Sequence, residues 1–389
     1  MLNSSSIIGI VGSGAMGSGI ALVAATAGHK VLVYDTNQAS LQSGSTQIRS
    51  VVNRIIEKKK ITADKGNEIF ENIIWADKPD GFTDCGLVIE AIIEDLEIKR
   101  KVFSSLEKLV SKDCIIASNT SSLSITSIAS SCQIPRRIVG IHFFNPAPLM
   151  PLVEIIPGLA SDEAVIAEAK KIIDSWNKVT VLAKDTPGFI VNRVARPFYG
   201  ESIRLYEEGV ADIATIDWAM KEFGGFKMGP FELMDLIGND INYTVTETVW
   251  KQMFYDPRYK PSLTQKRMVE AKRFGRKSGL GYYDHSANAI APQPIKNEVL
   301  GKSIFMRVLV MLINEAADAL YFNIATRDDI DLAMTKGVNY PKGLLKWADE
   351  TGVEKVLAEL QKLYEEYSED RYRPSVLLKR MARDKKKFY

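Results

Sequence analysis

The sequence predicts an α/β domain with a doubly wound parallel sheet, followed by two tandem all-helical domains related by internal duplication. Three observations predict this architecture. Short β-branched runs alternate with amphipathic helical segments in the first half of the chain. The second half reads as one helix after another. Residues of that half also recur at a nearly constant offset.

The expected strands of the first half are short β-branched runs, and Gly, Asp or Ser closes several of them. They are Ile7–Val11, Val31–Asp35, Leu87–Ala91, Cys114–Ser118, Arg137–Phe143, Leu152–Ile156 and Lys178–Val181. Amphipathic helices are expected between them, over Gly17–Ala27, Gln38–Lys60, Ile98–Leu109 and Glu163–Trp176. This alternation favours a parallel sheet covered by helices.

The alternation of strand and helix patterns stops after Asp185-Thr186-Pro187-Gly188. Beyond this point no strong strand signal occurs until Tyr282-Tyr283. A polar stretch that contains proline then separates two helical segments. We therefore expect a first domain over residues 1–184, a helical domain over 185–285, a linker over 286–297 and a second helical domain over 298–389.

The second helical domain repeats the first. A shift of 114 positions matches Arg193 to Arg307, Glu201 to Glu315, Asp217 to Asp331, Gly229 to Gly343 and Asp235 to Asp349. Further along, Pro261-Ser262 recurs as Pro374-Ser375, with a shift of 113. An offset that persists over several elements indicates a duplicated domain.

Composition excludes several classes of function. A formal net charge of +2 gives no global field that favours nucleic acid or an acidic membrane surface. No apolar run approaches the roughly 20 residues of a membrane-spanning helix. The three cysteines are widely spaced, without a C-x-x-C pair, so neither a disulfide framework nor a metal site is expected. We expect a cytoplasmic protein with reduced thiols.

Gly12-Ser13-Gly14-Ala15-Met16-Gly17 follows a strand and opens a helix, which is the context of a dinucleotide-binding turn. Asp35 ends the next strand, 18 residues past Gly17, where an acid binds the ribose 2′-hydroxyl. Thr36-Asn37-Gln38 offers no cation for a 2′-phosphate, so NAD is favoured over NADP. The alternative is a glycine turn in a βαβ unit that binds no nucleotide.

Two polar groups follow other strands at the edge where ligands gather in open α/β sheets. Glu94 and Lys99 are candidates for the cofactor, although acids also favour exposed helix starts. Ser121 lies in a polar cluster, residues 118–122, where one hydroxyl is a candidate for binding a substrate oxygen. Helix capping is the alternative for that cluster.

His142 and Glu154 form the candidate catalytic pair. His142 ends an expected strand, Glu154 lies on the next, and the chain has only three histidines. An imidazole near neutral pH can exchange the proton of a secondary alcohol, and a carboxylate can fix its tautomer. The alternative is that His142 is a structural residue of the core whose ring nitrogens are hydrogen-bonded. His29 is expected to be structural, and no partner is evident for His285.

Asn192 opens the helical half in Gly188-Phe189-Ile190-Val191-Asn192-Arg193. Its amide is a candidate for polarising a reacting carbonyl or a neighbouring thioester oxygen. The alternative role is a helix cap.

With these residues in place, the chain closely resembles the L-3-hydroxyacyl-CoA dehydrogenase family. The matching segments run almost continuously over residues 7–283. They include Gly12–Ile20, Ile89–Lys99, Ser118–Leu123, His142–Pro146 with Leu152–Glu154, Asp185–Arg193, Met228–Leu233 and Gly275–Tyr283.

The resemblance implies a Rossmann-like NAD domain and an all-helical domain that normally builds a dimer. It implies NAD-dependent, reversible oxidation of an (S)-3-hydroxyacyl-CoA, as in fatty-acid β-oxidation, butyrate-type metabolism or aromatic-acid degradation. His142 would be the acid/base, Glu154 its orienting partner, and Ser121 and Asn192 the groups that hold the 3-oxygen. NAD contacts are implied for the glycine-rich turn and for Asp35, Glu94, Lys99, Ser121, Asn145 and Lys277, and a CoA contact for Lys58.

The chain departs from the family pattern in two places. Position 151, commonly lysine in this motif, is Pro151 here. In the second helical copy the Asn192 position becomes Met306, and no nucleotide-binding half precedes that copy. We therefore expect the second copy to be non-catalytic and to occupy the place of a partner subunit, giving a pseudo-dimer within one chain. Further homo-oligomers are compatible with this arrangement.

Two other functions are alternatives. A dehydrogenase of a free hydroxy acid or sugar acid on the same fold would make Lys58 part of a solvated helix face. A non-catalytic, crystallin-like NAD-binding protein would have lost His142, Glu154 or Asn192, and all three are present.

Overall fold

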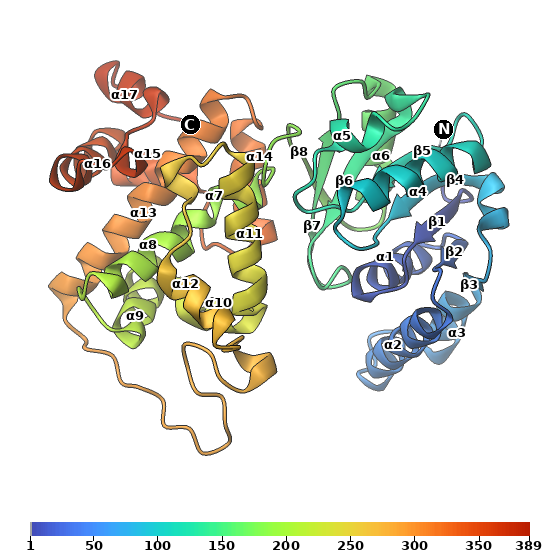
Figure 1. The fold of residues 1–389 in the computed structure, drawn as a ribbon, viewed down its shortest axis with the longest axis horizontal. Helices are drawn as coiled ribbons and strands as arrows, with labels where there is room; N and C mark the ends of the chain where they lie inside the picture. Colours follow the sequence, from blue (N-terminus) through green and yellow to red (C-terminus); the bar gives the residue numbers. More distant parts are fainter. Residues whose placement is uncertain (1) are drawn as a thin grey trace. The chain divides into compact units, whose positions relative to one another are not determined.

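The computed structural model describes residues 2–389 and divides them into two compact units (Figure 1). The first unit ends at Thr186 and the second spans Pro187–Tyr389.

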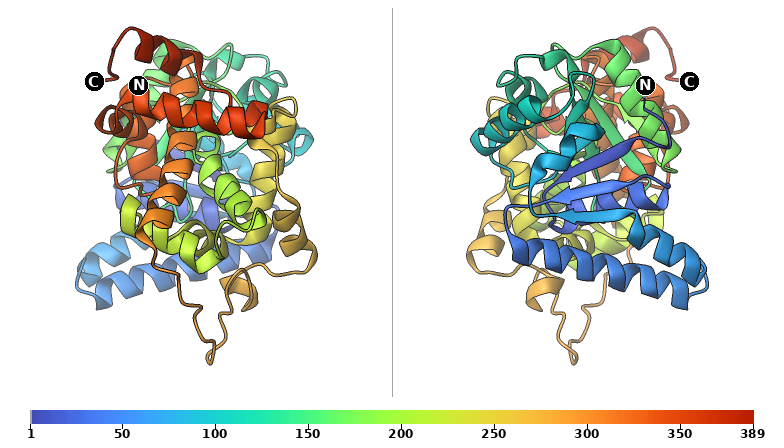
Figure 2. Two further views of the ribbon diagram at one scale, coloured as in Figure 1. Left: turned by 90° about the vertical axis from the view of Figure 1, so that its left-hand side faces the viewer. Right: turned by 90° about the vertical axis from the view of Figure 1, so that its right-hand side faces the viewer.

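The first unit is built on one sheet of eight strands, in the order β3-β2-β1-β4-β5-β6-β7-β8. All pairs are parallel except β6 with β7. Its strands are β1 Ile7–Val11, β2 Val31–Tyr34, β3 Ile73–Ala76, β4 Cys85–Glu90, β5 Ile115–Ser118, β6 Ile138–Phe143, β7 Leu152–Pro157 and β8 Val179–Leu182. The predicted doubly wound sheet is confirmed, although the antiparallel pair of β6 and β7 departs from the expected parallel arrangement. Figure 2 shows blue strands of this sheet side by side in its right-hand view.

Within residues 2–186, six α-helices accompany this sheet: α1 Ala15–Thr26, α2 Gln38–Glu57, α3 Ala63–Glu71, α4 Leu96–Leu109, α5 Ile125–Ala129 and α6 Glu163–Ser175. Strand β3 and helix α3 were not predicted from the sequence. Strand β3 has only four residues, and two of its side chains are partly exposed and one exposed, so it carries little hydrophobic periodicity. The helix expected over 38–60 ends at Glu57, because the following lysines leave the helical conformation and Lys59 has a φ of 54°.

The two faces of the sheet carry different side chains. Ile141 and Phe143 of β6, with Val153 and Ile155 of β7, join one core cluster together with residues of α1 and α6. Because side chains alternate along a strand, His142 and Glu154 lie on the opposite face. Helix α5 packs on that face, since a Cβ added at Gly140 would lie 2.8 Å from the Ile125 side chain.

The second unit is helical among its described residues, apart from short bridges near residues 275–284. The first copy contains α7 Val191–Val194, α8 Arg196–Glu207, α9 Ile213–Gly224, α10 Pro230–Ile237, α11 Asn239–Gln252 and α12 Leu263–Glu270. The second copy contains α13 Glu298–Tyr321, α14 Arg327–Gly337, α15 Leu344–Thr351, α16 Val353–Tyr367 and α17 Val376–Arg383. Helices α14, α15 and α16 begin 114 residues after α9, α10 and α11, and α17 begins 113 residues after α12.

Equivalent side chains of the two copies make equivalent hydrogen bonds. Asp217 accepts from the backbone N–H groups of Phe231 and Glu232, at the start of α10. Asp331 accepts from Leu345 and Lys346, at the start of α15. The duplication predicted from the sequence is therefore confirmed at the level of single contacts.

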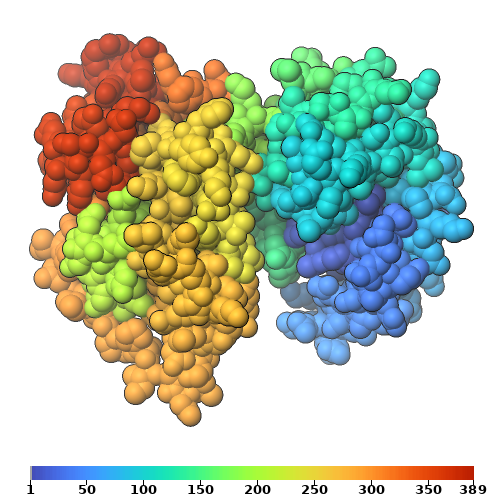
Figure 3. All heavy atoms as spheres, in the orientation of Figure 1, coloured from blue at the N-terminus to red at the C-terminus, as the bar shows by residue number. Residues whose placement is uncertain are grey.

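The copies differ at their first helix. The first copy has a short α7 and then α8, whereas the second copy has one continuous helix, α13. Pro197, at the start of α8, lacks the N–H that a continuous helix would use there. Residues 286–297 between the copies are largely exposed and form the orange lobe at the bottom of Figure 3.

Within residues 2–389, no helix is both long enough and apolar enough to cross a bilayer.

Candidate active site

The candidate catalytic pair faces across two antiparallel strands. The register of β6 and β7 places His142 opposite Glu154, and both side chains are buried. Nδ1 of His142 lies 2.7 Å from Oε2 of Glu154. A carboxylate accepts hydrogen bonds only, so Nδ1 carries the proton in this contact, and Nε2 of a neutral ring has a lone pair that can accept one.

The loop between β6 and β7 is held in place by hydrogen bonds from Lys178. It contains a cis peptide bond between Asn145 and Pro146, and Asn145 is exposed. The ammonium of Lys178 donates to the carbonyl oxygens of Ala147 and Met150 at 2.6 and 2.8 Å. Burial lowers the pKa of Lys178 to about 8. The sequence analysis did not single out Lys178, because its acceptors are backbone atoms that no motif marks.

The Pro151 departure is accommodated at the start of β7. Pro151 directly precedes β7, and its carbonyl accepts from the N–H of Val179, a contact that needs no N–H on the proline. The pairing of His142 with Glu154 is therefore compatible with proline at position 151.

The glycine-rich turn lies between β1 and the start of α1. Gly12 has a φ of 100°, and a Cβ there would lie 2.6 Å from the carbonyl oxygen of Ala91. A Cβ on Gly17 would overlap the carbonyl oxygen of Gly12 at 1.9 Å. Gly14 caps α1 without a side-chain hydrogen bond, and a Cβ there would meet no protein atom within 4 Å. First-turn N–H groups without a side-chain cap form a site for an anion.

Asp35 is fixed against this turn. Its carboxylate accepts from the backbone N–H and the hydroxyl of Ser13 at 2.8 and 2.9 Å, and from the N–H of Asn37 at 2.9 Å. A cavity of about 1060 Å³ runs from this point along the carboxyl ends of β1, β2 and β4. Gly12, Gly14, Ala15, Met16 and Asp35 line it. Such a crevice, where the strand order reverses between β1 and β4, is the usual ligand site of an open α/β sheet.

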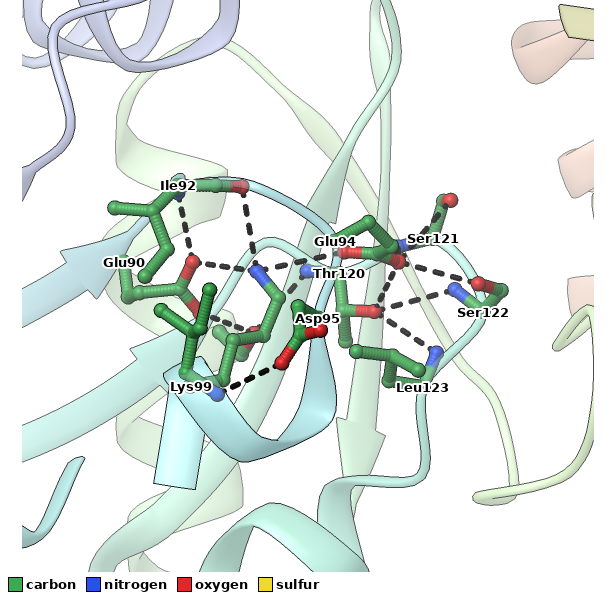
Figure 4. Close-up of polar contacts among 11 residues, drawn as sticks. Glu90, Ile92, Glu94, Asp95, Lys99, Thr120, Ser121, Ser122 and Leu123 are labelled. Carbon is green, nitrogen blue, oxygen red and sulfur yellow. Dashed lines mark hydrogen bonds and ion pairs between the residues drawn. The ribbon is translucent and has the colours of Figure 1, made fainter. Parts of the chain in front are cut away.

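An ion-pair network around the buried Lys99 lies at the end of β4 (Figure 4). It is next to Ile92 and Ile93, which line the cavity. Lys99 is only 1% exposed, and its ammonium lies 2.5 Å from Glu90 and 3.4 Å from Glu94. Glu90 also accepts from the hydroxyl of Ser118 and from the N–H of Ile92, both at 2.7 Å. Lys99 is therefore locked between two carboxylates and does not line the cavity.

Glu94 ties this network to the Ser118–Ser122 loop. It accepts from the hydroxyl of Thr120 at 2.5 Å, from the N–H of Ser121 at 3.0 Å and from the hydroxyl of Ser122 at 3.2 Å. Burial alone would raise the pKa of Glu94, but Lys99 and these hydrogen bonds lower it below its ordinary value. An ionised Glu94 thus orders the loop that carries Ser121.

Glu90 was missed as a functional candidate. It lies in the family-matching segment Ile89–Lys99, yet its partner Lys99 is nine residues away on α4, and lysine is ordinarily an exposed residue. Only the packing of α4 against the sheet brings the two charges together.

The remaining candidates lie apart from this cluster or in the second unit. Lys58 is exposed at the end of α2. Asn192 is partly exposed on α7. Lys277 forms an ion pair with Asp240 at 2.6 Å. Asn192 and Lys277 both belong to the second unit.

The other two histidines have partners. Nδ1 of His29 lies 2.9 Å from the carbonyl oxygen of Ser6, and the ring packs edge-on against Trp176. Nε2 of His285 lies 2.9 Å from Asp235, a partner that the sequence analysis did not find. Both contacts are structural.

The cysteines offer no reactive thiolate. Burial raises the pKa of the Cys85 and Cys114 thiols to about 12 and that of Cys132 to about 11. No group of three or more His, Cys, Asp or Glu side chains is arranged to hold a metal ion within residues 2–389.

Comparison with known proteins gives consistent matches along the chain. The family model described as the 3-hydroxyacyl-CoA dehydrogenase NAD binding domain matches residues 7–186. The model described as the 3-hydroxyacyl-CoA dehydrogenase C-terminal domain matches twice, at residues 188–285 and 304–387. The double match agrees with the duplication.

Individual relatives agree with the family models. The chain is 35% identical to 3-hydroxyadipyl-CoA dehydrogenase of Escherichia coli K12, over 96% of this chain and 97% of that protein. It is 40% identical to 3-hydroxybutyryl-CoA dehydrogenase of Bradyrhizobium diazoefficiens, over 72% and 94%. A crystal structure of 3-hydroxybutyryl-CoA dehydrogenase from Escherichia coli K12 superposes with a TM-score of 0.92 at 35% identity, covering 98% of each chain.

Proposed function

Because the chain belongs to the 3-hydroxyacyl-CoA dehydrogenase family and carries its NAD-binding domain, we propose that it interconverts an (S)-3-hydroxyacyl-CoA and the 3-ketoacyl-CoA. One observation carries the proposal: the buried pair of His142 and Glu154, 2.7 Å apart, at the sheet edge that also bears the nucleotide cavity. NAD, when bound, supplies the hydride acceptor in oxidation and the hydride donor in reduction.

The chain's own residues supply the proton chemistry. Nε2 of His142 takes the hydroxyl proton in oxidation and returns it to the ketone oxygen in reduction. Glu154 holds the proton on Nδ1, so Nε2 is available, and it stabilises the imidazolium that forms. We propose that Ser121 and Asn192 bind the 3-oxygen and polarise it. Lys58, exposed at the end of α2, is our candidate for the CoA end of the substrate.

The geometry of the glycine-rich turn supports the proposed cofactor contacts. Residues Gly12–Gly17 would hold the pyrophosphate at the start of α1, and Asp35 would accept from the ribose hydroxyls. We propose that Lys99 acts by holding Glu94 beside the cavity-lining residues Ile92 and Ile93 rather than by direct contact, because it is buried between Glu90 and Glu94. Ser121, Asn145 and Lys277 are further proposed contacts.

The decisive assay follows NADH absorbance with acetoacetyl-CoA. Rapid NADH oxidation supports the proposal. No oxidation with acetoacetyl-CoA or with a longer 3-ketoacyl-CoA, despite tight NADH binding, would overturn the thioester assignment and leave a free hydroxy acid as the substrate class.

A single methyl group tests the pyrophosphate site. Gly14→Ala is expected to raise the Kd for NADH about 10- to 100-fold, the equivalent of roughly 1–3 kcal/mol of steric conflict. The added Cβ has no protein neighbour within 4 Å, so the fold and thermal stability should stay unchanged. Fluorescence titration with NADH measures the effect.

Gly200→Ala is the matched control, because a Cβ at Gly200 on α8 also meets no atom within 4 Å. Wild-type NADH affinity in both variants would contradict a pyrophosphate bound over Gly14.

We also propose the domain organisation expected from the sequence, with residues 1–184 binding NAD and residues 298–389 acting as a non-catalytic second copy. Within the second unit, α13 of the second copy packs against α8 and α9 of the first. This packing supports an internal pseudo-dimer. We propose that several such chains can assemble further into a homo-oligomer. Light scattering with cross-linking tests the pseudo-dimer, and a dimer held together through the first helical copy would contradict it.

Three free cysteines support a cytoplasmic location.

A further inference from the structure

Two arginine–glutamate pairs cross between the helical copies in reciprocal fashion. Nε of Arg193, in the first copy, donates to Glu315 of the second at 2.7 Å. Nε of Arg307, in the second copy, donates to Glu201 of the first at 2.6 Å. Because the sequence repeat matches Arg193 with Arg307 and Glu201 with Glu315, the two pairs are equivalent contacts.

The spacing of these residues fixes how the helices meet. In each copy the arginine precedes the glutamate by eight residues. In the first copy the two residues lie on consecutive helices, α7 and α8, whereas in the second copy both lie on α13. Arg193 meets the later Glu315 and Glu201 meets the earlier Arg307, so α13 runs opposite to the α7–α8 segment. Sliding α13 by one turn would break both pairs.

The first pair lies in a buried, charge-balanced cluster. Arg193 and Glu315 are 6% and 2% exposed. The hydroxyl of Tyr259 also donates to Glu315, and Arg258 pairs with Asp318. Burial would lower the pKa of Arg193, but Glu315 raises it above the ordinary value. Two guanidinium groups thus face two carboxylates, and the loss of one carboxylate would leave an uncompensated buried cation.

The two arginine–glutamate pairs hold different helices in place. Arg193 belongs to α7, a helix of four residues that also carries Asn192. Helix α7 packs against α13 and α14, which both belong to the second copy. It is entered through Gly188 and Phe189, whose φ angles are 76° and 46°. The second pair holds α13, a continuous helix with Met306 at the position that matches Asn192.

We propose that Glu315 is a positioning residue: through its bond to Arg193, the non-catalytic second copy holds α7 and so fixes the place of Asn192. The inference rests on the proposed function, in which Asn192 polarises the reacting 3-oxygen. The second copy is then a working part of the enzyme, because a short helix has too few hydrogen bonds of its own to hold one side chain firmly.

The near-symmetry supplies a matched control. Glu315→Gln and Glu201→Gln each remove one buried carboxylate that accepts from one arginine and one tyrosine. We expect a smaller loss of thermal stability from Glu201→Gln, because Arg307 keeps its ion pair with Glu208, whereas Glu315 also lies 3.7 Å from Arg258. Glu315→Gln should lower kcat for acetoacetyl-CoA reduction about 10- to 100-fold, the effect of displacing a catalytic group by a fraction of an ångström to 1 Å. Glu201→Gln should leave kcat within about 3-fold of the wild type, and neither substitution should change KM for NADH.

A double-mutant cycle separates positioning from general loosening. If Glu315 acts through Asn192, then Glu315→Gln lowers kcat no further in an Asn192→Ala background. Equal kcat losses from Glu315→Gln and Glu201→Gln, or independent losses in the double variant, would overturn the inference. Should Glu315→Gln fail to fold, Glu315→Asp retains the charge, shortens the side chain by one methylene and is judged by the same comparisons.

The wild-type assay keeps the two proposals apart. An active enzyme whose Glu315 and Glu201 variants behave alike contradicts the positioning role and leaves the dehydrogenase proposal standing. A wild-type chain that binds NADH but reduces no 3-ketoacyl-CoA overturns the function, and the positioning role with it.

Discussion

His142→Gln is expected to lower kcat for acetoacetyl-CoA reduction by about 10²- to 10⁴-fold, the usual contribution of a general acid–base group. Glutamine nearly preserves the volume of the buried ring and can still hydrogen-bond to Glu154, but it cannot deliver a proton at neutral pH. The loss should appear in kcat, with the NADH dissociation constant unchanged. Stopped-flow absorbance of NADH measures the first quantity and fluorescence titration the second.

His29→Gln is the matched control in the same unit, because His29 is also buried and bonds to the backbone carbonyl of Ser6. It is expected to retain activity near that of the wild type. A His142→Gln enzyme that keeps most of its kcat would exclude His142 as the acid–base group. Equal losses in both variants would point instead to damage to the fold.

Much of the first unit was predictable because its signals are local. Strands β1, β2, β4 and β6 are rich in β-branched residues, and their carboxyl ends meet at one edge of the sheet. The turn at Gly12 follows from glycines whose added Cβ atoms would collide with backbone. The duplication was predictable too, because a constant offset needs no structural interpretation.

The rest depends on contacts between distant residues. The antiparallel β6–β7 register alone decides that His142 and Glu154 share a face and lie opposite each other. Burial of Lys99 requires Glu90 and Glu94 to meet it from another element. The reciprocal pairs join residues 122 and 106 positions apart. Sequence matching shows that these residues recur, but only packing shows that each bonds to the other copy.

Glu154→Gln is expected to lower kcat by about 10²- to 10⁴-fold without weakening NADH binding. The carboxylate of Glu154 accepts the Nδ1 proton at 2.7 Å and is fully buried, so its charge is little screened by water. A glutamine amide stabilises the imidazolium far less, and its NH₂ group favours the tautomer that carries the proton on Nε2. Glu68→Gln, at an exposed ion pair in the same unit, is the surface control and should not change kcat.

The double variant decides whether the two residues work as one device. If Glu154 acts only by orienting His142 and stabilising its charged form, His142→Gln and His142→Gln/Glu154→Gln should be equally slow, since members of one catalytic unit are not additive. Thermal melting of each variant checks that the sheet is intact. A double variant slower by the product of the two single losses would mean that Glu154 has a separate role in the reaction, and the assignment of orienting partner would be wrong.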